Sequence, residues 1–366
     1  MHGIACYCPH ELPPIPYKQR PTHYIMDILK QLSEMPGAPG REELVREFII
    51  EQVKDHVDEM HVDAMGNLLC RKKKVGDDVQ RVMLACHMDE IGFIVRHIDD
   101  KGFVRIQHLG GFDTRNLFAR RVRIQTRDGG ILIGNLNPGG RPVHVATPEE
   151  RNKIPKTSEF FIDLGMTKEQ VKEKVRVGDP VTLIQEFTEI GENLVSGKNM
   201  DNRVACWLGI RVLQQVTDPN CDLHVVFTVQ EEIGVRGAMT SAYQVKPDIS
   251  IALDVTLAVD TPGAGPEDYI TQLGEGCAIK IMDAGTVSHK ELVDTFIDLA
   301  EENDIKYQLE VLPFGATDNA AQQRARAGSK AIALSVPTRY VHTVTETIHK
   351  DDLYATLDLL KKYLQG

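Results

Sequence analysis

The fold is decided by the stretch Leu223-His224-Val225-Val226-Phe227-Thr228-Val229-Gln230-Glu231-Glu232-Ile233-Gly234. Its apolar part, Leu223–Val229, predicts a buried strand, and two adjacent acids follow where that strand leaves the core. Because neighbouring residues of an extended chain face opposite ways, Glu231 and Glu232 can have different neighbours. Such a pair suits a site in which one acid binds a metal ion and the other moves a proton. A solvated loop after a strand is the alternative interpretation.

Length, composition and charge exclude several classes of protein. The chain has 366 residues, of which 42% are apolar and 26% charged, as expected for one or two globular domains. The net charge of −11 argues against a nucleic-acid partner. No apolar run approaches the length of a membrane span, and the first residues lack the pattern of a signal peptide. We therefore expect a cytoplasmic protein.

The cysteines predict reduced thiols. Seven in a chain of this length do not indicate a disulfide framework. Those inside apolar segments should pack as small hydrophobic residues: Cys70, Cys86, Cys206 and Cys277. The N-terminal residues 1–22 offer four metal-ligand types: His2, Cys6, Cys8 and His10. Prolines follow them directly and no periodic pattern is present, so a mobile tail is preferred to a metal site.

Two chain segments, 1–90 and 192–366, alternate strand and helix patterns and predict one α/β domain with a mixed sheet flanked by helices. The predicted strands are a hairpin over Val57–Arg71 and then Val82–Cys86, Leu223–Val229, Ile249–Leu253, Ala278–Met282, Tyr307–Val311 and Ala331–Val336. The predicted helices are His23–Glu34, Leu44–Val53, Asn202–Gln215, Ala238–Tyr243, His289–Asn303 and Asp351–Leu364.

The segment between them, residues 91–191, has a different sequence pattern. Short β-like pieces alternate with Gly and Pro turns, and only Thr167–Lys174 indicates a helix. The β-like pieces are Phe93–His97, Phe103–His108, Arg121–Thr126, Gly130–Leu136 and Pro180–Ile184. The α/β domain is therefore predicted to be interrupted by an inserted β-rich, barrel-like domain.

Metal-ligand residue types recur where apolar runs end. His87 and Asp89 follow the predicted strand Val82–Cys86; two positions apart in an extended chain, they point the same way. One could bind a metal ion while the other orients it through the far ring nitrogen. Asp201 lies just before a predicted helix, where an N-cap is the alternative role.

Two more candidates follow predicted strands. Asp254 follows Ile249–Leu253, and open α/β sheets bind ligands at the carboxyl ends of their strands. His342 lies beyond Ala331–Val336, also at a carboxyl end. The segment Phe314–Asp318 either lines a substrate cleft or caps the next helix.

The whole set comprises two imidazoles and three carboxylates: His87, Asp201, Glu232, Asp254 and His342. These ligand types suit two divalent ions of the zinc, cobalt or manganese type. One carboxylate must bridge the ions if each is to receive three protein ligands. A thiolate zinc site is not indicated, because no cysteine pair has ligand spacing.

Five motifs in this order and spacing resemble the glutamyl-aminopeptidase and tetrahedral-aminopeptidase family of dinuclear metallopeptidases, some members of which carry older endoglucanase labels. The motifs are His87-Met88-Asp89-Glu90-Ile91-Gly92, Lys198-Asn199-Met200-Asp201-Asn202-Arg203, Gln230-Glu231-Glu232-Ile233-Gly234, Leu253-Asp254-Val255-Thr256 and Arg339-Tyr340-Val341-His342. The resemblance runs from about Met26 to the C-terminus. It implies a zinc-aminopeptidase-like catalytic domain.

The resemblance also implies roles for residues. One metal ion would be held by His87, Asp201 and Asp254, and the other by Asp201, Glu232 and His342, with Asp201 bridging. Asp89 would orient His87, and Glu231 would be the general base. Asn202 departs from relatives that often carry a second Asp there, which bears on metal affinity.

At the level of the whole molecule, the inserted domain resembles the family's dimerisation domain, and such proteins typically form hollow tetrahedral dodecamers. The expected function is a metal-dependent aminopeptidase that releases the first residue of peptides. The alternatives are a dinuclear deacylase, a glycosidase, and a catalytically idle assembly protein. A glycosidase normally needs two carboxylates flanking a sugar and no metal, so the five ligand-type residues argue against it.

Overall fold

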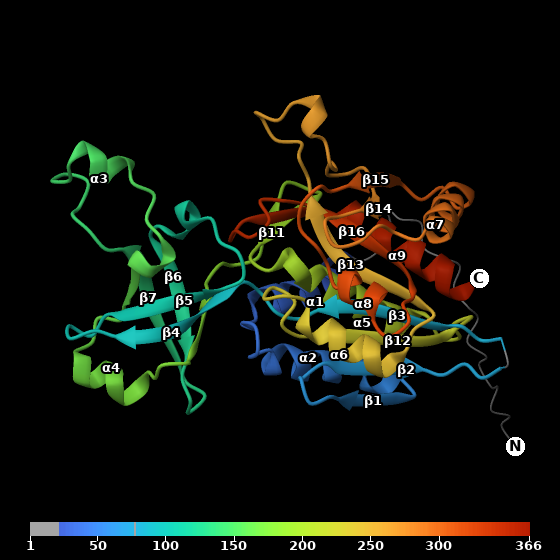
Figure 1. Cartoon of the computed structure of the whole chain (residues 1–366), viewed down its shortest axis with the longest axis horizontal. Coiled ribbons are helices and arrows are strands. Elements are labelled where there is room, and N and C mark those ends of the chain that lie inside the picture. Colours follow the sequence, from blue (N-terminus) through green and yellow to red (C-terminus); the bar gives the residue numbers. More distant parts are fainter. Residues whose placement is uncertain (1–21, 77) are drawn as a thin grey trace, which may run out of the picture.

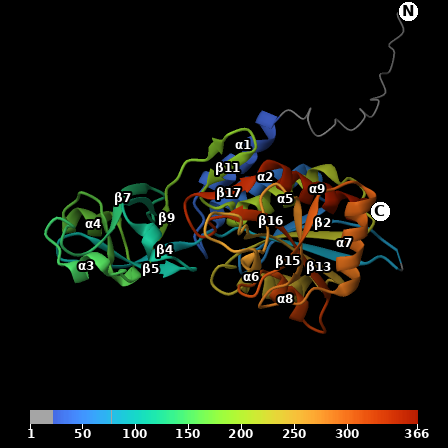
Figure 2. The same ribbon diagram turned by 90° about the horizontal axis from the view of Figure 1, so that it is seen from above.

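The computed structural model describes residues 22–76 and 78–366, which form an α/β domain and a β-barrel projecting from one end of it (Figure 1, Figure 2). The predicted N-terminal tail lies almost wholly outside the described residues. Within them, no helix combines the length and apolar character needed to cross a bilayer.

The α/β domain is built on one mixed sheet with the strand order β1-β2-β12-β3-β13-β16-β17-β11-β10. Its central strands β12, β3, β13 and β16 run parallel, and β14 and β15 extend the sheet from β16. The strands are β1 (Glu59–Val62), β2 (Leu68–Lys72), β3 (Arg81–His87), β10 (Thr188–Ile190), β11 (Leu194–Gly197), β12 (Asp222–Thr228), β13 (Ile249–Leu257), β14 (Cys277–Met282), β15 (Tyr307–Val311), β16 (Lys330–Arg339) and β17 (Glu346–His349).

Helices cover both faces of this sheet, as predicted (Figure 1). One face carries α1 (Thr22–Glu34), α2 (Glu43–Val53), α5 (Met200–Gln215), α7 (Lys290–Glu302) and α9 (Lys350–Gln365). The other carries α6 (Arg236–Val245) and α8 (Asn319–Arg324). The apolar runs of β3 and β12 are buried on both faces, because helices pack on each side of them. Cys70, Cys86, Cys206 and Cys277 are buried free thiols in this domain, as expected.

The inserted domain is a closed barrel with the order β4-β5-β8-β7-β6-β9. Its strands are β4 (Gly92–Ile98), β5 (Val104–Leu109), β6 (Arg120–Gln125), β7 (Ile131–Pro138), β8 (Phe160–Asp163) and β9 (Pro180–Leu183). Alternate residues such as Phe93, Val122 and Ile162 point inward and form a separate core. Two short helices, α3 (Pro148–Asn152) and α4 (Lys168–Lys174), lie outside the barrel.

Most predicted elements agree with the structure to within a few residues, but two differ in a way that matters. β13 continues to Leu257 because it pairs with β16 as far as Thr338, so Asp254 lies inside the strand instead of at its end. β12 stops at Thr228, and the two acids follow in a turn. Four short strands, β8, β10, β11 and β17, were not predicted.

Candidate metal and catalytic site

The predicted site residues meet at one edge of the sheet, where parallel strands have their carboxyl ends. His87 ends β3, Glu231 and Glu232 follow β12, and Asp254 lies near the end of β13. Because β12, β3 and β13 are adjacent and parallel, these side chains are brought together. Asp201 comes from the start of α5 and His342 from the turn after β16. We call the six residues named here the acidic centre.

Asp201 lies between the two imidazoles. Its Oδ1 is 3.1 Å from Nε2 of His87, and its Oδ2 is 3.3 Å from Nε2 of His342. Asp201 and Asn202 have non-helical backbone angles, and Asn199 is the N-cap, so the alternative N-cap role for Asp201 is wrong. Because the backbone is not helical here, the Asp201 carboxylate faces both His87 and His342.

The remaining acids divide between the two imidazoles. Asp254 Oδ1 lies 3.8 Å and Glu231 Oε2 3.9 Å from Nε2 of His87. Glu232 Oε2 lies 3.4 Å from Nε2 of His342. Ligand atoms of His87, Asp201 and Glu232 all lie within 4.8 Å of one another, a spacing that could hold a metal ion. The residue pair Glu231–Glu232 therefore has different neighbours, as expected from its position after a strand.

Asp89 is fully buried and contacts both His87 and the acid pair. Its Oδ1 is 3.6 Å from Nδ1 of His87, and its backbone oxygen is closer to that nitrogen, at 3.2 Å. The two carboxylate oxygens accept the backbone N–H groups of Glu231 and Glu232, at 3.0 and 3.1 Å. Asp89 thus fixes the turn that carries both acids, a contact that the sequence did not indicate.

Glu346, like Asp89, holds backbone groups of the site in place. The sequence did not predict this role. Its side chain is buried, and its two oxygens accept the backbone N–H groups of Asp201 and His342, at 3.0 and 2.8 Å. A single Glu at the start of β17 gives no sequence signal of this kind. Asn202 is also buried, and its amide donates to the backbone oxygen of Leu253 at 2.9 Å, so in this chain it supports the neighbouring strand.

The acidic centre places four carboxyl groups beside two imidazoles, and burial opposes the ionisation of these acids. Burial raises the pKa of Glu231 and Glu232 well above the usual range, and raises that of Asp254 to about 8. Burial also opposes ionisation of Asp201, but hydrogen bonds with His342 and His87 hold its pKa below the usual value. Glu232 Oε1 is buried and has no hydrogen-bond partner within residues 22–76 and 78–366. A buried acidic group with an unpartnered carboxylate oxygen fits bound divalent cations.

A cleft of about 450 Å³ opens onto the acidic centre. Its wall is largely apolar and includes Val255, Leu257, Leu312, Phe314 and Val341. The segment from Phe314 to Thr317 lines this cleft, which agrees with one of the two interpretations of its sequence. The cleft gives a substrate side chain an apolar surface directly beside the acids.

Comparison with known proteins identifies the family. A family model described as M42 glutamyl aminopeptidase matches residues 66–359. The lysyl aminopeptidase of Pyrococcus furiosus is 30% identical over 345 residues, which cover 93% of this chain and 96% of that protein.

Solved structures give the same result. Aminopeptidase APDkam598 from the archaeon Desulfurococcus kamchatkensis has a TM-score of 0.89 at 36% identity, covering 94% of this chain and 95% of that one. The TET1 peptidase of Pyrococcus horikoshii, which can assemble into a tetrahedron or a large octahedral shell, has a TM-score of 0.83 at 30% identity and covers 93% of this chain and 99% of that one. Together with the acid-rich edge of the sheet, these matches show that the chain belongs to the M42 glutamyl aminopeptidase family and is a metallo-aminopeptidase, a hydrolase of peptide bonds.

Proposed function

We propose that the chain removes the first residue of peptides with two divalent metal ions and with Glu231 as the general base. The observation that carries this proposal is the placement of Asp201, whose two oxygens face the imidazoles of His87 and His342 separately. A carboxylate in that position can serve two ions at once.

The proposed ligand sets follow from the neighbours of each imidazole. His87, Asp201 and Asp254 would hold one ion, and Asp201, Glu232 and His342 the other. Zinc or cobalt fits this mixture of imidazole and carboxylate best, and manganese is a third candidate. When bound, such ions lower the pKa of a water molecule and polarise the scissile carbonyl.

Glu231 is the acid left over when the ligands are assigned. Its Oε2 lies in the same pocket, 3.9 Å from Nε2 of His87, and burial raises its pKa. Such a group can accept a proton as water adds to the carbonyl carbon. It can then donate that proton to the nitrogen as the C–N bond breaks, which leaves a carboxylic acid and a free amine. The hydrogen bond from its backbone N–H to Asp89 keeps it in place.

The experiment is the substitution Glu231→Gln, with Glu302→Gln on the exposed end of α7 as the matched control. Hydrolysis of a panel of aminoacyl amides with added zinc, cobalt or manganese should fall by roughly 10²–10⁴-fold in the first variant only. Metal content, measured by elemental analysis, should not change. Wild-type turnover by Glu231→Gln would remove the proposed base. Including N-acylated amides and a glucan in the panel also tests the deacylase and glycosidase alternatives.

We further propose that residues 1–90 and 192–366 form the catalytic unit and that residues 91–191 join subunits, up to a tetrahedral dodecamer. The barrel exposes large apolar side chains that a partner copy could cover: Phe118, Ile131, Ile133, Val143, Val145 and Ile154. Light scattering coupled to gel filtration should give a mass close to twelve chains, and Ile133→Glu should reduce it while the fold is retained. A monomeric wild-type protein would contradict this proposal.

A further inference from the structure

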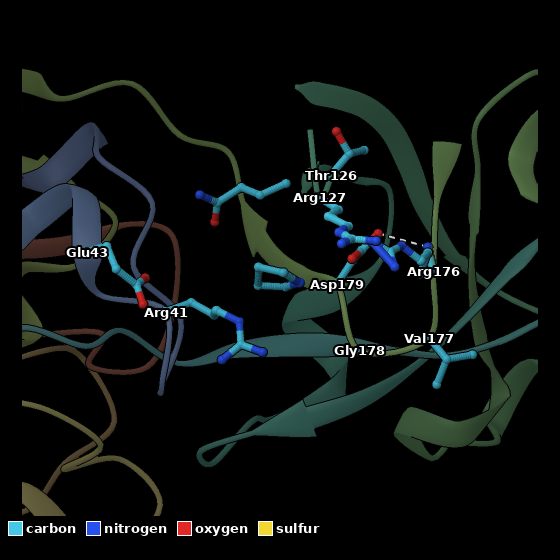
Figure 3. Close-up of a pocket in the computed structure, with 10 residues that line it drawn as sticks. Arg41, Glu43, Thr126, Arg127, Arg176, Val177, Gly178 and Asp179 are labelled. Atoms are coloured by element: carbon cyan, nitrogen blue, oxygen red, sulfur yellow. Dashed lines mark hydrogen bonds between the residues drawn. The ribbon is translucent and has the colours of Figure 1, made fainter. Parts of the chain in front are cut away.

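A second pocket, of about 420 Å³, lies at the junction of the two domains, away from the acidic centre (Figure 3). Arg41, just before α2, and Glu43, the first residue of α2, reach it from the α/β domain, and the opposite wall comes from the barrel (Figure 3). That wall consists of Gln125 at the end of β6 with the two residues after it, and of residues 176–180, which lead into the start of β9. Any molecule bound there would contact both domains. We call it the junction pocket.

The lining of the junction pocket contains three arginines beside two acids, Glu43 and Asp179. Arg41, Arg127 and Arg176 come from three separate segments, and within residues 22–76 and 78–366 none of them forms an ion pair with a carboxylate. Three other barrel arginines, Arg105, Arg115 and Arg141, have carboxylate partners. Guanidinium groups that line a cavity without a carboxylate partner favour an anion with several oxygen atoms.

The junction pocket is connected to the acidic centre through a short hydrogen-bonded path. Arg41 precedes Glu42, which is 3% exposed. Oε1 of Glu42 accepts the backbone N–H of Gly40 at 2.7 Å and that of Gln230 at 3.1 Å. Gln230 directly precedes Glu231. Because Glu42 directly follows Arg41, a ligand that immobilises Arg41 also restrains Glu42. Glu42 in turn holds Gln230, the residue before Glu231.

We propose that the junction pocket binds a small polyanion of the phosphate or polycarboxylate class, and that this binding stiffens the turn that carries Glu231. The anion would be held by forked contacts from Arg41 on one side and from Arg127 and Arg176 on the other. Because the three groups lie on both domains, binding also fixes the barrel relative to the catalytic domain. The binding step itself does not depend on the peptidase chemistry.

Calorimetric titration of the full-length, metal-loaded protein tests the binding step. The probes are inorganic phosphate and tricarballylate, which separate a phosphorylated from a carboxylated ligand, in about 150 mM salt so that weak surface contacts are screened. The test variant is Arg127→Gln with Arg176→Gln. The charge-matched control is Arg96→Gln with Arg151→Gln, two exposed barrel arginines outside the pocket. Light scattering confirms that all proteins have the same assembly.

We expect one site per chain for at least one probe in the wild type and the control, and binding at least about tenfold weaker in the test variant. Equal affinity in all three proteins, or no saturable binding, would overturn the site. Hydrogen exchange at residues 230–234 should slow on saturation in the wild type and not in the test variant. Binding without this change would overturn the link to the acid pair while leaving the peptidase assignment untouched.

Discussion

Two buried charge clusters each include a residue of α5, and they differ in how their charge is balanced. In the Glu90 cluster, made of Glu90, Lys198 and Arg203, the carboxylate receives the Lys198 ammonium at 2.9 and 2.7 Å and lies 3.8 Å from Arg203. The backbone N–H of Gly37 also donates to it. In the acidic centre, four carboxyl groups share two imidazoles, and Glu232 Oε1 has no hydrogen-bond partner among the described residues. The chain therefore supplies the counter-charge of Glu90, whereas the acidic centre has more carboxyl groups than imidazoles, which suits bound cations.

The largest expected effect is that of removing the metal ions from the acidic centre. Chelation should abolish aminoacyl amide hydrolysis, and zinc, cobalt or manganese should restore it. Because ions bind only the folded centre, each should add about 4 kcal/mol to the free energy of unfolding at a thousandfold excess over its Kd. Thermal unfolding with and without metal measures this. An unfolding midpoint that does not change when metal is added would contradict the difference in charge balance between the acidic centre and the Glu90 cluster.

Breaking the Glu90 cluster should have the next largest effect. Lys198→Met leaves Glu90 buried with much of its counter-charge removed, which should lower the free energy of unfolding by about 3–5 kcal/mol. Urea unfolding of the metal-free protein measures the loss without a contribution from bound ions.

The double substitution Glu90→Gln with Lys198→Met is the control for that prediction. It removes the charges of Glu90 and Lys198 and keeps an acceptor for Gly37, but it leaves the buried Arg203 guanidinium without its carboxylate, so it should recover only part of the stability. If Lys198→Met alone lowered the free energy of unfolding by less than about 1 kcal/mol, the pair of Glu90 and Lys198 would contribute no more than an ordinary surface ion pair.

The smallest effect is expected for Glu346→Gln, which alters the support of the acidic centre without removing a ligand. Glutamine can accept only one of the two backbone N–H groups, so Asp201 or His342 loses its anchor. Metal affinity should fall about 10–100-fold, or roughly 1.4–2.8 kcal/mol. Competition with a fluorescent chelator measures this affinity, and Glu302→Gln again serves as control. Unchanged affinity would show that the anchor has no influence on the ions.

Much of the fold was predictable because local patterns and tertiary structure agree. The apolar runs that became β3 and β12 are buried as expected. The hairpin around Met65-Gly66-Asn67 forms because Asp63 accepts all three backbone N–H groups of that turn. The length of β13 was not predictable, since Asp254 interrupts its apolar pattern and pairing with β16 sets where it ends.

The candidate site was predictable only as far as its residue types. His87, Asp201, Glu231, Glu232, Asp254 and His342 were all named from the sequence, and the structure brings them together. Glu346 was missed because its role consists of two hydrogen bonds to backbone groups far away in the chain. The spacing of residues in the sequence does not indicate such a contact. The junction pocket was missed for the same reason, because its arginines meet only after the two domains have folded.

The residues of the acidic centre lie far apart in the sequence, from His87 to His342. This spacing determines when the centre can form during synthesis of the chain. His87 is made early, Asp201 only after the entire barrel, and His342 close to the last helix. A nascent chain on the ribosome therefore carries isolated ligands, none of which can retain an ion alone. The centre can therefore close only after His342 has been made and the α/β domain has folded, so a chain that is still short of that residue lacks the complete site.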